Sequence, residues 1–218
     1  MPELEKIQEN VIESEVDPDY RLWLTSMPNK KFPVSVLQSG IKLTNEPPKG
    51  MKANLKRIYN DIKPEIYNSC TKDYEFKKLI FSLAFFHSII LERRKFGAIG
   101  WNIYYKWMDS DLESSQKQLV MYLDEHPEVP FETLVYLIAT INYGGRVTDR
   151  RDERLIDGIL RKYMNKDIMN KIFHYSKKGD YYNPETLELA EISKIIEQLP
   201  REDDPEIFGM HSNAMITF

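Results

Sequence analysis

The spacing of hydrophobic residues changes near Pro47-Pro48. Before this point the pattern predicts short elements of mixed type: an amphipathic helix over 2–17, an apolar and aromatic strand over 20–25, a helix over 32–37 that Gly40 ends, and a second strand over 41–44. Prolines and glycines interrupt a chain more strongly than other residues. We therefore expect a boundary between two parts of the chain at Pro47-Pro48 and Gly50.

Helical spacing dominates after Gly50, where we count about six substantial helices joined by short connections. The longest, over 73–96, is apolar almost all round, which is typical of a helix at the centre of a bundle. We expect Asp73 to cap its start and Gly97 to end it in a left-handed conformation. The predicted fold is mainly α: a helical bundle with a short α/β remnant of two strands on its N-terminal side.

Several local signals predict where the other helices begin and end. Met51, Leu55, Ile58 and Ile62 share a face that ends before Pro64. The remaining starts and stops are a capping box at Ser110-x-x-Glu113, a helix from Phe131 closed by Gly144-Gly145, a helix capped by Thr148 or Asp149, and a last helix that Asn183-Pro184 opens and Pro200 ends.

Composition narrows the class of protein. Lys and Arg number 30 against 34 Asp and Glu, and the net charge of −4 gives no support to nucleic-acid binding. A hydrophobic fraction of 42% is too high for a disordered chain. The single cysteine, Cys70, excludes an internal disulfide and a zinc quartet. With no signal-peptide pattern and no bilayer-spanning apolar run, we expect a soluble protein of a reducing compartment.

A search for catalytic chemistry finds few candidates. The phosphate-binding pattern G-x-x-x-x-G-K-[ST] is absent from the sequence. Gly144-Gly145-Arg146 is compatible with a phosphate site at the start of the next helix, but a helix stop followed by a helix start explains it better. His87 lies on the apolar helix and is expected to be a hydrogen-bonded core histidine. From the residues alone, the prediction is a mostly helical module without an active site of its own.

Two clusters of charge remain open to two interpretations. The run Glu92-Arg-Arg-Lys95 suits an acidic or phosphate-bearing partner, and a solvated helix end explains it equally well. The cluster 148–154, with Arg146 beside it, suits either a contact to a neighbouring module or an ordinary soluble helix face.

Several short strings of residues, taken in their order along the chain, resemble the part of dynein heavy chains near their carboxyl-terminal end. The matching strings are RLWLTS at 21–26, KFPVSVLQ at 31–38, TNEPPKG at 44–50, ERRKFG at 92–97, GWNI at 100–103, VPF at 129–131, YGGRVTD at 143–149, PEIFG at 205–209 and HSNA at 211–214. The GWNI string and the Asn-Ala pair after His211 are more similar to the axonemal than to the cytoplasmic branch.

The resemblance implies a place in the sixth AAA+ module of the dynein motor ring. Residues 1–48 would be the end of its large α/β subdomain, and residues 49–218 the helical lid that leads to the carboxyl-terminal domain. This fragment would be non-catalytic and would bind no cofactor, because the ATP- and magnesium-binding residues of the parent motor lie elsewhere. Its partners would be the neighbouring AAA+ modules and the carboxyl-terminal domain, with dynein subunits and microtubules reached through the parent, in the cytoskeleton of the ciliary or flagellar axoneme. No nucleic acid and no membrane is implied as a partner.

The function expected from these observations is to transmit ring rearrangements as a rigid unit. The candidate inter-module contacts are Arg93, Arg94, Arg146 and Asp149. Two alternatives remain: a free-standing helical scaffold that binds a partner helix, and a nucleotide-binding AAA+ fragment that would use Arg146.

Overall fold

The computed structural model describes residues 2–27, 29–43, 46–185 and 188–216. By its internal contacts the chain divides into two compact units, Met1–Pro47 and Pro48–Phe218. We call them the N-terminal unit and the helical unit and describe each by itself.

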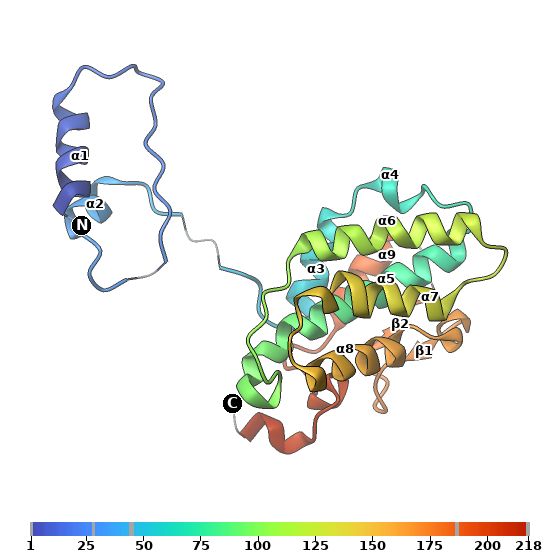
Figure 1. Cartoon of the computed structure of the whole chain (residues 1–218). Helices are drawn as coiled ribbons and strands as arrows, with labels where there is room; N and C mark the ends of the chain where they lie inside the picture. The colour runs from blue at the N-terminus through green and yellow to red at the C-terminus, as the bar shows by residue number, and fades with distance from the viewer. Residues whose placement is uncertain (1, 28, 44–45, 186–187, 217–218) are drawn as a thin grey trace. The chain divides into compact units, whose positions relative to one another are not determined.

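The N-terminal unit contains two helices, α1 (Pro2–Glu13) and α2 (Val34–Ser39). They lie side by side, and the Ser35 hydroxyl donates a 2.8 Å hydrogen bond to the Glu5 carboxylate (Figure 1). Gly40 follows the end of α2 as predicted, whereas the helix begins at Val34, two residues later than expected, with Pro33 at its cap position.

The two strands predicted in this unit are not formed. Residues 20–25 and 41–43 have no regular secondary structure, and Thr44 lies outside the described residues. A strand is stable only when its backbone N–H and C=O groups pair with a neighbour, and neither segment has such a neighbour among the described residues. The prediction of a two-stranded remnant on the N-terminal side was therefore wrong for this chain.

The helical unit confirms the mainly α prediction. Its α-helices are α3 (Met51–Asp61), α4 (Pro64–Tyr67), α5 (Asp73–Glu92), α6 (Asp109–Glu125), α7 (Phe131–Tyr136), α8 (Arg150–Tyr163) and α9 (Leu189–Gln198). A two-stranded antiparallel sheet, β1 (Phe173–His174) with β2 (Tyr182–Asn183), pairs Phe173 with Asn183. The short helical turns are η1 (Arg93–Ile99), η2 (Leu137–Asn142), η3 (Gly144–Arg146), η4 (Lys166–Met169), η5 (Pro205–Phe208) and η6 (Ser212–Ile216).

Helix α5 is the centre of this unit, as its apolar sequence predicted. It packs against α3, α6 and α8, which surround it in Figure 1. Nearly every side chain from Phe76 to Ile90 is buried. Phe85 illustrates the packing, since its ring stacks on Tyr175 with centroids 4.4 Å apart and meets Tyr163 edge-on at 5.2 Å. Such contacts on every side make α5 the element that holds the bundle together.

Three predicted helix starts were displaced. Asp73 is the first helical residue of α5 and pairs with Lys77, while Lys72 occupies the cap position. Helix α6 begins before Ser110, and the capping carboxylate is Asp111, which accepts from the Met108 N–H at 2.9 Å. Asn183 ends β2 instead of capping a helix. Its buried side-chain NH2 group lies within hydrogen-bond distance of Lys78 O, Ser82 Oγ and the Tyr175 hydroxyl, so it donates to polar groups of the core.

Helix α7 continues into a π-helical turn, η2, that periodicity did not predict. Its wider turn closes with the Tyr143 N–H donating to Ile138 O at 3.0 Å. Gly144 follows at once, and a Cβ there would overlap the Ala139 carbonyl oxygen. The glycine pair therefore ends the helix as predicted, with close backbone approach as the reason.

Candidate functional site

Three of the four predicted contact residues surround one segment, Gly100–Tyr104. Arg93 and Arg94 reach it from the end of α5, and Asp149 reaches it from the start of α8. Arg146 lies apart, in the η3 turn, where it pairs with Asp111 of α6. The segment therefore joins two charge clusters that sequence reasoning treated separately.

Arg93 is buried, with 3% of its surface exposed, so it is not the surface contact that was expected. Its guanidinium donates to Gly100 O at 3.0 Å and to the Phe208 carbonyl, and it lies 5.2 Å from the centre of the Trp101 ring. Burial lowers the pKa of Arg93 to about 10, which still leaves it charged at neutral pH. A cation at this point binds two backbone carbonyls that would otherwise be buried without a donor. Arg93 therefore joins parts of the helical unit to each other.

Arg94 is half-buried and lies at the edge of the same segment. Its Nε donates to Leu91 O at 3.1 Å, and its guanidinium lies 6.0 Å from the centre of the Tyr104 ring. Tyr104 is 76% exposed. Arg94 and Tyr104 form a surface pair with an aromatic face available to another molecule.

Asp149 caps α8, whose predicted cap was either Thr148 or Asp149. Its carboxylate accepts from the Asp152 N–H at 3.2 Å, the Arg151 N–H at 2.8 Å and the Asn102 amide at 3.2 Å. The backbone hydrogen bonds from Asp152 and Arg151 lower the pKa of Asp149. Most of its capacity to accept hydrogen bonds is thus used within the helical unit.

Asp152 is a site residue that the sequence analysis missed. It is 2% exposed and accepts from the backbone N–H groups of Asn102 at 3.0 Å and Ile103 at 3.3 Å. The signal was present in the sequence, because Asp152 occupies the same helix face as Ile156 and Ile159. A carboxylate on an apolar face needs donors, and here the 100–104 segment supplies them.

Arg146 pairs with Asp111 of α6, with 3.0 Å between Nη2 and Oδ1. The other oxygen of Asp111 accepts from the start of α6, so this carboxylate connects the η3 turn to that helix. The Arg146 side chain is 40% exposed, and one guanidinium edge remains accessible from the surface.

His87 is a hydrogen-bonded core histidine, as predicted. It is fully buried, and its Nδ1 lies 2.9 Å from the Tyr143 hydroxyl. Its Nε2 lies 3.7 Å from Asp109 Oδ1, too far for a hydrogen bond, while Arg57 donates to both Asp109 oxygens at 2.8 and 2.9 Å. Burial lowers the pKa of His87, and the neighbouring His87 and Arg57 lower the pKa of Asp109. The Asp109 carboxylate thus links α3 to α6 through Arg57, and His87 of α5 lies beside it.

The C-terminal segment is bound to the helices by Asp203, which is 7% exposed. Its carboxylate accepts from the Met51 N–H at 3.1 Å and from the Tyr181 hydroxyl at 3.3 Å, and Lys95 Nζ lies 3.5 Å away. One buried carboxylate thereby connects the start of α3, the η1 turn and the residues before η5.

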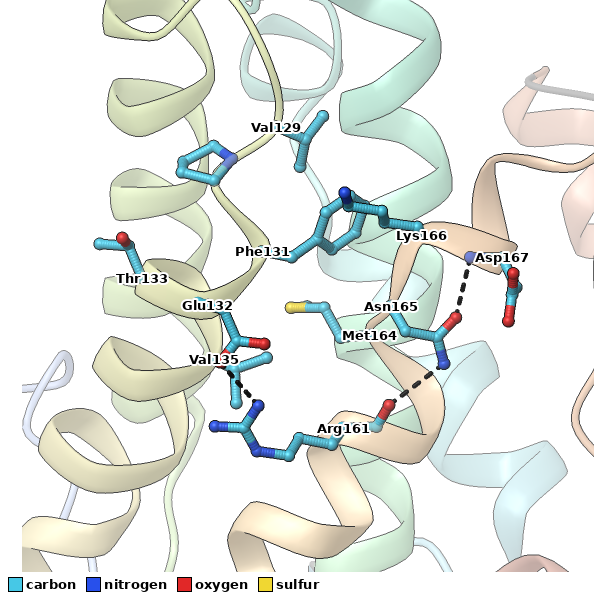
Figure 2. Close-up of a pocket in the computed structure, with 11 residues that line it drawn as sticks. Val129, Phe131, Glu132, Thr133, Val135, Arg161, Met164, Asn165, Lys166 and Asp167 are labelled. Atoms are coloured by element: carbon cyan, nitrogen blue, oxygen red, sulfur yellow. Dashed lines mark hydrogen bonds and ion pairs between the residues drawn. The ribbon is translucent and has the colours of Figure 1, made fainter.

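A surface hollow of about 620 Å³ lies between the N-terminal end of α7 and the C-terminal end of α8. Figure 2 shows Glu132 and Arg161 pointing toward one another across it, with 2.8 Å between their charged atoms. The Asn165 side chain accepts from the Asp167 N–H at 2.9 Å. The lining is apolar around Phe131 and Met164, and the ion pair of Glu132 with Arg161 lies at its rim.

The Cys70 thiol, the one cysteine of the sequence, lies in surroundings that do not favour its reactive form. Burial raises the pKa of Cys70 to about 11, and its Sγ lies 3.4 Å from an Asp124 carboxylate oxygen, so the thiolate is disfavoured at neutral pH. Across the described ranges, no group of three or more His, Cys, Asp or Glu side chains is placed to hold a metal ion. None of the helices in the described part has the length and apolar character needed to cross a bilayer.

Comparisons with known proteins agree with this architecture. Residues 76–214 match the family model of the dynein heavy chain AAA lid domain, and residues 1–44 match the dynein heavy chain region D6 P-loop domain. The chain is 48% identical over 219 residues to dynein axonemal heavy chain 1 of Rattus norvegicus and 48% over 221 residues to dynein axonemal heavy chain 3 of Mus musculus, each covering 100% of this chain. It is 42% identical over 216 residues, 96% of this chain, to dynein axonemal heavy chain 6 of Homo sapiens.

The chain spans 5% of the length of each of these relatives. The resemblance to dynein heavy chains expected from the sequence, and its axonemal character, are confirmed. Because the lid model covers most of the helical unit and the relatives match throughout, the chain belongs to the dynein heavy chain family and includes its AAA lid domain.

Proposed function

We propose that this chain is a non-catalytic structural module of an axonemal dynein heavy chain. Residues 49–218 are the helical lid, and residues 1–48 are the end of the large subdomain of the same AAA+ module. In the parent motor, which uses ATP and magnesium bound elsewhere, the lid transmits ring rearrangements to its neighbours during ciliary or flagellar motility. Its direct partners are the adjacent AAA+ modules and the carboxyl-terminal domain, and dynein subunits and microtubules are reached through the parent.

The observation that carries this proposal is the use of buried charges as internal links. Arg93, Asp152 and Asp203 each join segments that lie far apart in the sequence, and each is at most 7% exposed. Close-packed elements linked in this way shift together rather than deform one by one. A unit of this kind can pass a displacement from one surface to another.

The N-terminal unit supports the assignment of residues 1–48 to a larger subdomain. Val36 is buried, whereas Trp23 is 77% exposed and Ile41 95% exposed. A segment with exposed apolar side chains gains burial when it adds to the sheet of a larger domain. Residues 1–44 match the family model of a P-loop domain, and the phosphate-binding pattern typical of a P-loop is absent from this sequence.

Arg94, Arg146 and Asp149 remain the proposed contacts to neighbouring modules. Arg94 contributes together with the exposed Tyr104 ring, and Arg146 contributes the guanidinium edge that Asp111 leaves accessible. Asp149 contributes indirectly, because it orients the 100–104 segment through Asn102. Arg93 is withdrawn from this set, since its side chain is buried.

Calorimetry tests the non-catalytic assignment directly. Titration of ATP with magnesium, and of ADP, into the 218-residue chain should give no binding heat. Micromolar affinity would contradict the proposal, and loss of that affinity in Arg146→Ala would favour a nucleotide-binding fragment instead.

The coupling role requires the full heavy chain. We expect Arg94→Ala combined with Tyr104→Ala to slow microtubule gliding while the ATP turnover of the motor is retained. An unchanged ratio of gliding velocity to ATP turnover would contradict transmission through this surface.

A further inference from the structure

The outward face of α8 carries an unusual concentration of positive charge. Five cationic side chains of this helix are exposed: Arg150, Arg151, Arg154, Arg161 and Lys162. We call them the basic face of α8. Two carboxylates, Glu153 and Asp157, lie at one edge of it, so the face is positive although the chain carries a net charge of −4.

Helix geometry gathers these side chains into one stripe. At about 100° per residue the five cations fall within an arc of about 120°, opposite the buried Ile156, Ile159 and Tyr163. Gly158 lies in the middle of the arc and is exposed, and a Cβ added there meets no atom within 4 Å. The stripe is about 17 Å long from Arg150 to Arg161. At Gly158, where no side chain projects, the backbone of another molecule can approach closely.

Most of this charge is not neutralised within the helical unit. Arg161 pairs with Asp157 and Glu132, each at 2.8 Å, and Lys162 Nζ lies 3.4 Å from Glu206 O. Among the described residues, Arg150, Arg151 and Arg154 have no carboxylate within ion-pair distance.

Local stability does not explain three arginines at this position. They occupy the first two turns of α8, where the positive end of the helix dipole disfavours cations. Arg150 and Arg154 also repel each other at a separation of four residues. Their placement weakens the isolated helix, so an external anionic group is the simplest source of compensation.

We propose that the basic face of α8 binds an acidic helix of a partner protein, which packs over Gly158 with its carboxylates against Arg150, Arg151 and Arg154. The edge carboxylates Glu153 and Asp157 would repel a continuous phosphate backbone, and the face has no aromatic ring for base stacking. The separate carboxylates of an acidic helix can match the spacing of the arginines and still stay away from Glu153 and Asp157. The proposal rests on α8 alone, so it is independent of the nucleotide titrations above.

The test uses the 218-residue chain and a fluorescein-labelled peptide of glutamate and alanine, with glutamates three and four residues apart. Binding is followed by fluorescence anisotropy at about 20 mM and about 200 mM NaCl. The test variant carries Arg150→Glu, Arg151→Glu and Arg154→Glu. Its matched control carries Lys106→Glu, Lys117→Glu and Lys194→Glu, which change three other exposed cations by the same charge.

We expect the arginine variant to lose about tenfold or more in affinity and the lysine control to lose less than about twofold. Affinity of the native chain should fall at the higher salt concentration. The arginine variant keeps its fold because glutamate suits the first turns of a helix better than arginine, and circular dichroism verifies this. Gly158→Gln should also weaken binding severalfold, because its side chain fills the point of closest approach.

Equal losses in the two triple variants would overturn the proposal, since they would reflect net charge alone. Tighter binding of an oligothymidylate than of the peptide would replace it with a nucleic-acid surface. Unchanged affinity in Gly158→Gln would contradict the close helix packing.

Discussion

The Arg93 guanidinium donates to the carbonyl oxygen of Phe208, which lies 115 residues later in the chain. The same side chain binds Gly100 O, so one cation holds three segments together at the end of α5. A residue that was expected on the surface is therefore a link inside the helical unit.

Removing this link should destabilise the fold strongly. Arg93→Ala leaves two buried carbonyl oxygens without a donor, and we expect the free energy of unfolding to fall by about 3 kcal/mol. Arg94→Ala is the matched control, with an expected loss below about 1 kcal/mol because Arg94 is only half-buried. Urea unfolding followed by circular dichroism measures both, and equal losses would contradict the role given to Arg93.

His87 should make stability depend on pH. Burial holds its folded-state pKa below the ordinary value of 6.5, so below that pH the unfolded chain binds a proton at His87 that the folded chain does not. Stability is therefore highest above pH 6.5 and falls as the pH drops toward the folded-state pKa.

The comparison is between thermal midpoints at pH 7 and at about pH 5. His87→Gln should show a smaller decrease than the native chain, whereas His174→Gln, on an exposed residue, should match the native chain. If His87→Gln leaves the decrease unchanged, another group is responsible for it.

The carboxylate of Asp152 should stabilise the 100–104 segment more than Asp149 does. Asp152→Ala leaves the Asn102 and Ile103 N–H groups without an acceptor, and we expect a loss of about 2 kcal/mol against about 1 kcal/mol for Asp149→Ala. Hydrogen exchange at the Asn102 and Ile103 amides should accelerate in Asp152→Ala. Protection of both amides at the native level would rule out this assignment.

Two glycines should respond in opposite directions to the same substitution. Gly158→Ala adds a methyl group in open space within a helix and should raise the free energy of unfolding by about 0.5–1 kcal/mol. Gly144→Ala should lower it by at least about 1 kcal/mol, because the new Cβ overlaps the Ala139 carbonyl. Thermal unfolding of the pair provides the measurement, and a stabilising Gly144→Ala would disprove the close approach.

The helical unit should fold without the N-terminal unit. Its hydrophobic core extends from Met51 to Ala214 and, among the residues that the structure describes, includes none before Met51. A fragment of residues 48–218 should therefore unfold cooperatively, with a midpoint within about 2 °C of the full chain. A non-cooperative transition in the fragment would show that the N-terminal unit is needed.

The sequence by itself determined the helical class, the central position of α5, the core location of His87, the end of the α7–η2 helix before Gly144 and the family. These depend on periodicity, local backbone requirements and strings of residues, which are all readable along the chain. Only the tertiary structure decided that Arg93 and Asp152 are buried links, that Asn183 belongs to a strand, and that residues 20–25 have no strand partner within the described part of the chain. The physical reason is that burial and hydrogen-bond pairing depend on segments up to more than a hundred residues away, and no local pattern contains that information.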